Sequence, residues 1–229
     1  MKKLSDWNVV GLQSITNSGM VGNHVTRRHA LTMRITRIIA AAAAAVLVGT
    51  TAFALDTYKV DPAHSSIGFS IDHMVIDTVH GRFRQFDGSI TVDPDSGNAL
   101  KQASATIQTK SIETDVEKRD NHLRSPDFFD AEKYPTITFE STGVDGQTLT
   151  GKFTMHGVTK EISLPIKVKG PIKDPMGNTH LSLEANTKLN RKDYGLAWNK
   201  VLEAGGLMVG EDVTIQINGS FVKQTAEKK

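Results

Sequence analysis

The chain has 229 residues, of which 38% are hydrophobic and 23% charged, and it contains no cysteine. This is the composition of a folded domain rather than of a disordered chain, and it excludes disulfides and anchoring through a lipidated cysteine. The net charge of +2 comes from residues 1–54, where six Lys or Arg face one acid. Residues 55–229 hold 21 basic and 24 acidic residues. Such a mildly acidic body with interspersed signs lacks the basic patch that nucleic-acid binding requires.

The segment 33–54 has the order of parts of a secretory signal peptide. Residues 33–37 (MRITR) form a short basic region, residues 38–48 are an unbroken apolar run, and residues 52–54 (AFA) form a small-residue cleavage site. An uncleaved membrane anchor is the alternative, but it needs about 20 strongly apolar residues, and Gly49, Thr50 and Thr51 interrupt this run. We therefore expect a periplasmic or secreted protein whose mature domain is 55–229.

Residues 1–32 show no periodic apolar pattern. They precede Met33, which can itself begin a complete signal peptide. We interpret residues 1–32 as an over-extended start, with Met1 and Met33 both open as the translation start.

From residue 57 onward, apolar and polar residues alternate with a period of two, which predicts β-strands. Turn residues such as 93–97 (DPDSG) and 145–146 (DG) separate the alternating runs. About nine strands are expected, at residues 58–60, 67–71, 90–92, 103–107, 137–139, 149–155, 162–168, 181–185 and 213–221.

One stretch breaks the alternation. Residues 116–124 (VEKRDNHLR) predict a short helix that Ser125 and Pro126 end. With so little helix to cover a sheet, the sheet must cover its own apolar face, so the sequence predicts an all-β barrel or sandwich.

Four small residues lie on the same alternating face as the large apolar ones: Ala103, Ala105, Gly151 and Ala185. Small inward positions leave room for a ligand in an eight-stranded barrel. They can equally accommodate bulky neighbours in a dry core, and the pattern alone does not separate these alternatives.

Polar residues that could carry chemistry are few and scattered. Arg119, His122 and Arg124 are concentrated in the helical segment, where they could bind an anionic head group or hold the helix through local ion pairs. No histidine has the spacing of a metal site, and no nucleophile has an evident oriented base.

Several motifs together resemble the YceI-like family of exported lipid-binding barrels. They cover essentially the whole mature chain in order: residues 58–69 (YKVDPAHSSIGF), 81–88 (GRFRQFDG), 119–130 (RDNHLRSPDFFD), 134–139 (YPTITF), 149–158 (LTGKFTMHGV), 190–195 (NRKDYG), 198–199 (WN) and 209–213 (VGEDV).

The resemblance implies a lipocalin-like, extended eight-stranded antiparallel barrel with one short helical segment, enclosing a tunnel for a polyisoprenoid or related long-chain lipid. We predict that the ligand contacts Phe69, Phe83, Phe86, Ala105, Ile107, Arg119, His122, Arg124, Phe128, Phe129, Phe139, Gly151, Phe153, Leu183, Trp198 and Ile217.

The primary hypothesis is an exported protein that sequesters or carries an isoprenoid or acyl lipid, without a cofactor, a metal or a reaction. The alternatives are a lipid-modifying or metal-assisted hydrolase using His64, His122 or His156, and a ligand-free scaffold domain. No stable membrane span is expected after cleavage, and the oligomeric state is open between a monomer and a homodimer.

The signal-peptide interpretation predicts that the mature chain begins at or next to Leu55. N-terminal sequencing of protein purified from the cell envelope measures this. A chain that retains Met33 in the membrane fraction would contradict the prediction.

Overall fold

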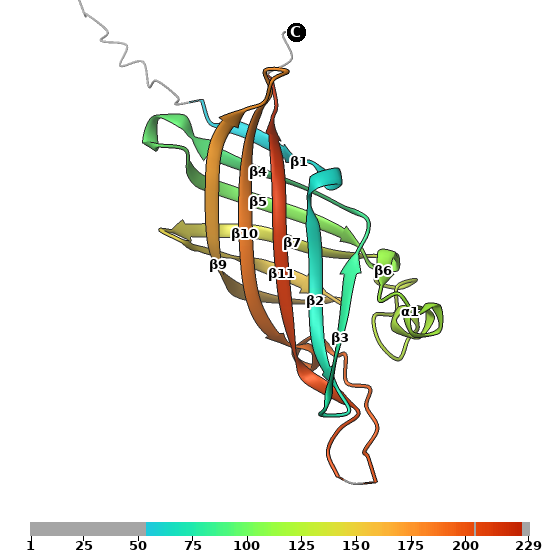
Figure 1. Ribbon diagram of the computed structural model, residues 1–229. Helices are drawn as coiled ribbons and strands as arrows, with labels where there is room; N and C mark the ends of the chain where they lie inside the picture. The colour runs from blue at the N-terminus through green and yellow to red at the C-terminus, as the bar shows by residue number, and fades with distance from the viewer. Residues whose placement is uncertain (1–53, 204, 226–229) are drawn as a thin grey trace, which may run out of the picture. The chain divides into compact units, whose positions relative to one another are not determined.

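The computed structural model describes residues 54–203 and 205–225, so the predicted signal peptide and the segment before it lie outside the described residues. The described part consists mostly of eleven strands (Figure 1): β1 Asp56–Val60, β2 Ser66–His73, β3 Asp77–Phe83, β4 Phe86–Asp93, β5 Ala99–Gln108, β6 Ile112–Glu113, β7 Thr136–Asp145, β8 Thr148–Met155, β9 Val158–Lys173, β10 Thr179–Asn190 and β11 Val209–Lys223.

Eight of these strands form a closed antiparallel ring in the order β1, β4, β5, β7, β8, β9, β10 and β11. β1 closes the ring because it pairs with β4 on one side and with the C-terminal end of β11 on the other. The predicted all-β, eight-stranded antiparallel barrel is confirmed.

The remaining strands lengthen the ring on one side. β2 follows β1 after a short turn, the 3-10 helix η1 (Pro62–His64), and both pair with β11. β3 pairs with β2, and β6 pairs with β3. Each of the pairs β1 and β2, β3 and β4, and β5 and β6 is therefore one long strand with a short interruption, which in the last pair lies close to the end.

The helix α1 (Glu117–Arg124) lies beside β6, at the side of the barrel where β6 has only β3 as a strand partner (Figure 1). Its bounds agree with the predicted helical segment. The backbone of Ser125 leaves the helical region at φ −73° and ψ 169°, as expected for a residue before proline.

Two strands were not predicted, β3 and β6. β3 (DTVHGRF) alternates poorly because Gly81 stands where an inward side chain would be. Gly81 faces Phe69 of β2, and a Cβ atom there would lie 2.2 Å from the Phe69 ring. β6 has only two residues, which is too short for a period to be visible.

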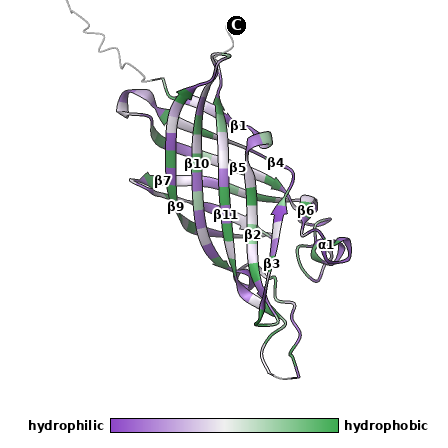
Figure 2. Ribbon diagram, in the orientation of Figure 1, coloured by the Kyte–Doolittle hydropathy of each residue, from purple (hydrophilic) through white to green (hydrophobic). Residues whose placement is uncertain are grey.

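Hydrophobic and hydrophilic residues alternate along the strands (Figure 2), as expected where successive side chains point to opposite faces of a sheet. The inward residues form two buried clusters. One, around Tyr58, Leu100 and Leu181, fills the end of the barrel near β1. The other, around Ile112, Ile137 and Tyr194, lies near α1.

The turn between β9 and β10 is held by Asp174. Its carboxylate accepts hydrogen bonds from the backbone N–H groups of Met176 and Asn178 at 2.9 and 2.8 Å, and from Asn178 Nδ2 and His180 Nε2 at 2.9 and 3.0 Å. The hydrogen bonds from Asn178 and then His180 lower the pKa of Asp174 from 3.8 to about 2.

A carboxyl group whose pKa is lower in the folded state stabilises the fold above its unfolded pKa, and this contribution is lost as the pH falls. We expect Asp174→Asn to destabilise the barrel at neutral pH, with the difference from the wild type shrinking as the pH falls from about 4 toward 2. Urea unfolding across that pH range measures this. Asp145→Asn, at the exposed end of β7, is the matched control, and an equal loss in both variants would contradict the role of Asp174.

Candidate ligand cavity

The barrel encloses an apolar cavity of about 200 Å³. Its wall comes from inward positions of most strands and from the segment after α1. The large hydrophobic wall residues are Val60, Ile67, Phe69, Ile71, Phe83, Phe86, Ile90, Ile107, Leu123, Phe128, Phe129, Ile137, Phe139, Leu149, Phe153, Met155, Ile162, Leu164, Leu183, Leu189, Leu196, Val209, Val213, Ile215, Ile217 and Phe221.

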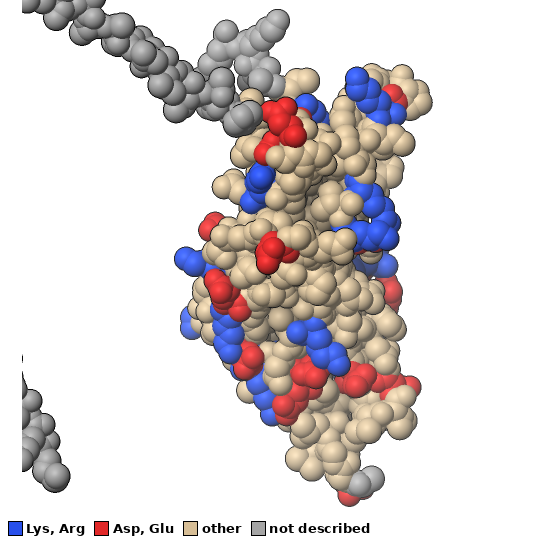
Figure 3. Space-filling view, turned by 90° about the vertical axis from the view of Figure 1, so that its left-hand side faces the viewer, with Lys and Arg blue, Asp and Glu red and all other residues tan. Residues whose placement is uncertain are grey.

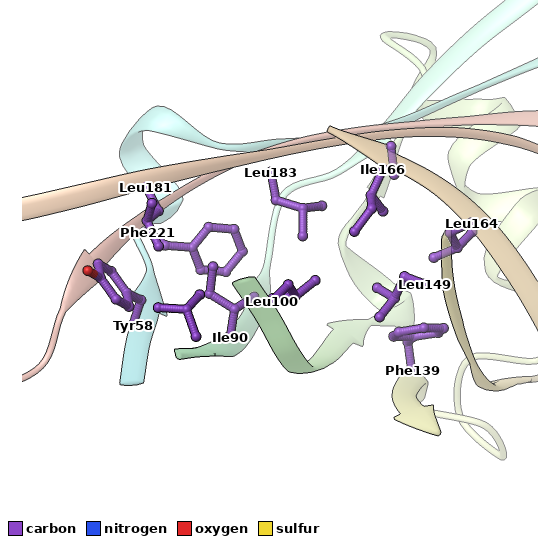
Figure 4. Packing of buried hydrophobic residues seen from close by; sticks show 12 residues of the cluster. Tyr58, Ile90, Leu100, Phe139, Leu149, Leu164, Ile166, Leu181, Leu183 and Phe221 are labelled. Carbon is purple, nitrogen blue, oxygen red and sulfur yellow. The ribbon is translucent and has the colours of Figure 1, made fainter. Parts of the chain in front are cut away.

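The end of the cavity nearest β1 is filled. Phe221 and Ile90 line the cavity, whereas the buried Tyr58, Leu100 and Leu181 lie beyond them and do not (Figure 4). The opposite end of the cavity reaches Ile71 and Val209, close to the β2–β3 turn (Met74–Ile76).

Small residues keep the lumen open. Ala103, Ala105 and Gly88 lie on the wall formed by β4 and β5, and Ala185 lies on β10. Packing large side chains at all of these positions would fill the space. The interior is thus hollow rather than the dry core that the sequence left open.

Aromatic rings lie over glycines in the wall. A Cβ atom at Gly151 would lie 2.5 Å from the Phe139 ring, and one at Gly219 would lie 2.5 Å from the Phe221 ring. In each case the ring occupies space that a side chain would take, so it lies against the sheet instead of projecting fully into the lumen.

The polar face of α1 is directed at the barrel backbone. Arg119 donates to the hydroxyl and carbonyl of Thr114, both at 2.7 Å. Arg124 donates to the carbonyls of Lys110 and Ile112 at 2.8 and 2.7 Å. The buried Asp120 accepts from the backbone N–H and the hydroxyl of Thr114 at 2.8 and 2.6 Å.

The apolar side of the same segment faces the cavity. Leu123, Phe128 and Phe129 are cavity wall residues, and the Phe129 ring meets Phe83 edge-on at 6.0 Å. The segment therefore replaces a strand as wall where β6 and β7 do not pair.

An aromatic cluster joins this segment to the loop before β11. The rings of His122, Phe128 and Trp198 lie with centroids 5.0 to 5.1 Å apart. His122 Nε2 also lies 2.9 Å from the Asp127 carboxylate. The cluster holds two loops that are distant in sequence against each other.

Arg191, at the end of β10, is a cavity wall residue that we did not predict. It is 3% exposed and donates to the carbonyls of Gly210, Val209 and Leu196. Burial lowers the pKa of its guanidinium from the ordinary value. The signal was present in the sequence, because Arg191 continues the inward alternation of Leu181, Leu183 and Leu189.

Comparison with known proteins identifies the family. The YceI-like domain matches residues 58–221. A UPF0312 protein of Staphylococcus aureus (strain N315) is 37% identical over 168 residues, which cover 73% of this chain and 98% of the relative. The chain belongs to the YceI-like family.

Solved structures have the same YceI-like fold. A Campylobacter jejuni YCEI protein aligns with a TM-score of 0.55 and 28% identity over 67% of this chain and 90% of the other. A polyisoprenoid binding domain from Saccharophagus degradans aligns with a TM-score of 0.56 and 17% identity over 73% and 98%.

Most of the predicted ligand contacts lie together in the wall of the YceI-like cavity. These are Phe69, Phe83, Phe86, Ala105, Ile107, Phe128, Phe129, Phe139, Phe153, Leu183 and Ile217.

The other five are not wall residues. Gly151 lies behind the Phe139 ring. The rings of Trp198 and His122 belong to the aromatic cluster. Arg119 and Arg124 donate to backbone carbonyls. Their contact with a ligand stays a prediction. For the two arginines, the geometry favours the alternative in which they hold the helix.

The three histidines of the hydrolase alternative have different partners. His64 Nδ1 lies 2.6 Å from Asp61, His122 pairs with Asp127, and His156 Nδ1 lies 3.0 Å from the Tyr194 carbonyl. In residues 54–203 and 205–225, no group of three or more His, Cys, Asp or Glu is placed to hold a metal ion. No helix in these residues is long and apolar enough to cross a membrane.

The glycine beneath Phe139 gives a test of the wall. We expect Gly151→Ala to cost about 1–3 kcal/mol of the free energy of unfolding, because the added methyl would lie 2.5 Å from the Phe139 ring and 2.6 Å from the Glu140 carbonyl oxygen. Gly143→Ala, in the same hairpin, meets nothing within 4 Å and is the matched control. Urea unfolding of both variants compares them, and equal stabilities would show that Phe139 moves without cost.

Proposed function

We propose that this chain is an exported carrier that binds a long-chain isoprenoid or related acyl lipid in the lumen of its barrel. The observation that carries the proposal is the cavity, which is lined by more than twenty large apolar side chains and closed at one end by Tyr58, Leu100 and Leu181. A chain-like apolar ligand matches this long, lined interior better than a compact polar one.

Hydrophobic burial can supply the affinity. Each methylene group removed from water contributes about 0.8 kcal/mol, so a long tail binds with few polar contacts. The gain must exceed the cost of ordering the ligand, and a preformed wall keeps that cost low. The neighbour named as a polyisoprenoid binding domain supports an isoprenoid as one ligand class.

A binding role agrees better with the polar groups than a catalytic one. The Arg191 guanidinium donates to backbone carbonyls, the Ser65 hydroxyl donates to the Ser220 carbonyl, and Asp87 accepts from the Gly88 N–H. The polar residues of the cavity wall are Ser65, Ser66, Asp87, Ser104, Thr187, Arg191 and Asn218. His64, His122 and His156 are not wall residues, and each ring has a separate partner. Catalysis needs a nucleophile or base that reaches the bound substrate.

Export is the second element of the proposal. It rests on the order of basic, apolar and small-residue parts in residues 33–54. An exported carrier would take up lipid at one site of the cell envelope and release it at another.

Ala105→Phe tests the lumen as the ligand site. Ala105 lies between Gly88 of β4 and Phe139 of β7, so a phenyl ring there would occupy the cavity. We expect the lipid recovered per mole of purified protein to fall several-fold, measured by mass spectrometry of organic extracts. Overpacking should cost about 1–3 kcal/mol, so folding is checked by circular dichroism.

Thr106→Phe is the matched control, since Thr106 is the adjacent, exposed residue of the same strand. It should leave the lipid content unchanged. Empty extracts from wild-type protein, or full lipid content in a folded Ala105→Phe variant, would refute the lumen as the binding site.

A further inference from the structure

The end of the barrel opposite β1 carries exposed apolar side chains on two adjoining turns. In the β2–β3 turn, Val75 is 72% exposed and Ile76 is 80% exposed; in the loop before β11, Val201 is 79% exposed. The two turns touch: the Met74 N–H donates to the Met208 carbonyl at 2.8 Å, and a Cβ atom at Gly206 would lie 3.3 Å from Val75 Cγ2. We refer to Met74, Val75, Ile76 and Val201 as the apolar tip.

The backbone of the β2–β3 turn adopts a conformation that is energetically unfavourable for the residues it contains. Six non-glycine residues of the described chain have positive φ, and four of them are Asn, Asp or His, which tolerate this conformation. The other two are Met74 and Val75, at φ 53° and 68°. A β-branched residue is strained there, whereas Asn and Gly adopt positive φ at lower cost. The exposed apolar side chains of the tip therefore stand on a strained stretch of backbone.

The apolar tip adjoins the cavity. Ile71 and Val209 are cavity wall residues, and Val209 pairs with His73, the residue before Met74. The opposite end is filled by the core around Tyr58. A lipid tail that enters along the barrel axis therefore has its shortest apolar route at the tip.

We propose that the apolar tip inserts into the interfacial region of an electrically neutral lipid bilayer. The tip is a projection formed by two turns, which suits insertion among head groups. Its exposed charged neighbours are Asp72, Asp77 and Glu203 against Lys200, an excess of acid that anionic lipid would repel. On the face seen in Figure 3, acidic and basic side chains are interspersed along the barrel wall, several acidic ones gather just above the lower end, and the lower end itself is mostly uncharged.

Entry of a lipid tail at the apolar tip rests on the proposed lipid function. Binding of the tip to a bilayer is measured separately from the lipid bound in the lumen. The chain from residue 55 onward is suitable for this, because the Staphylococcus aureus relative consists almost entirely of the matching 168 residues and all described strands lie within residues 56–223. Phosphatidylcholine vesicles are the probe, and flotation gives the partition coefficient.

The decisive variant is Met74→Asn with Val75→Gly. It installs residues that favour positive φ, so the hairpin should be at least as stable as in the wild type, while two apolar side chains are removed. We expect the partition coefficient to fall by about tenfold or more, as removal of a buried apolar side chain predicts. Ile76→Ser, which leaves both positive-φ residues unchanged, should weaken binding by a comparable factor.

The matched control is Ile172→Ser with Met176→Ser. These residues are 70% and 84% exposed, but the pairing of β10 with β11 places them at the opposite end of the barrel. This variant should bind vesicles like the wild type. Adding phosphatidylglycerol should weaken wild-type binding at low salt.

Three outcomes would overturn the proposal. The first is that the wild-type protein does not float with vesicles. This includes the case in which sedimentation shows that the tip forms a dimer contact instead. The second is unchanged binding in the tip variants or lost binding in the control. The third is binding that strengthens with phosphatidylglycerol, which would indicate charge attraction. Empty organic extracts would refute the lipid cargo alone and leave the flotation result standing.

Discussion

The barrel depends on the short strand β1, because β1 alone joins the two ends of the eight-stranded ring. Its backbone pairs with β4 through four residue pairs and with β11 through three. Without these pairs, β4 and β11 would be edges with unpaired N–H and C=O groups, and the apolar faces of all eight strands would be open to water. The fully buried Tyr58 lies at this junction and packs with Ile90 and Phe221 (Figure 4). The barrel end that β1 closes is therefore filled with side chains, and the cavity begins at Phe221.

The other half of the barrel is closed differently, and this explains where its polar groups are used. β6 pairs with β3, and α1 lies where a strand partner on the other side would be. Arg124 donates to the carbonyls of Lys110 and Ile112 at this interruption, and Arg119 donates to the carbonyl of Thr114. Ile112 and Thr114 are buried, and buried backbone acceptors are paired in native structures, so the two guanidinium groups supply donors where the sheet is interrupted. The wall behind them is apolar, as Leu123, Phe128 and Phe129 show.

The sequence predicted what depends on local periodicity and left open what depends on contacts across the barrel. Alternation identified nine runs, the helix and the inward residues, because side chains of one strand face the lumen at every second position. Alternation did not identify β3, because the Phe69 ring of the neighbouring strand occupies the space where an inward side chain of residue 81 would lie. The same limit applies to Gly151, which alternation places on the inner face but which lies behind Phe139. The targets of Arg119 and Arg124 are backbone carbonyls at an interruption of the sheet, and no residue pattern marks such an acceptor.

The distribution of polar groups determines what kind of selectivity this cavity can have. Arg191 is a wall residue, yet its guanidinium donates to the carbonyls of Val209 and Gly210 in β11 and of Leu196 in the preceding loop, so it holds that loop in place. Discrimination by hydrogen bonds requires buried groups that are left unpaired by the wrong ligand, and the carbonyl contacts of Arg119, Arg124 and Arg191 already use much of the donor capacity of these cations. The wall also contains the polar residues Ser65, Ser66, Asp87, Ser104, Thr187 and Asn218. Large apolar side chains outnumber them, so for the proposed lipid ligand we expect discrimination to come mainly from the shape of the lumen between Phe221 and its opposite end. A filled end at Tyr58 would limit how far the tail of the proposed lipid can advance, so we expect tail length and branching to affect binding more than head-group chemistry.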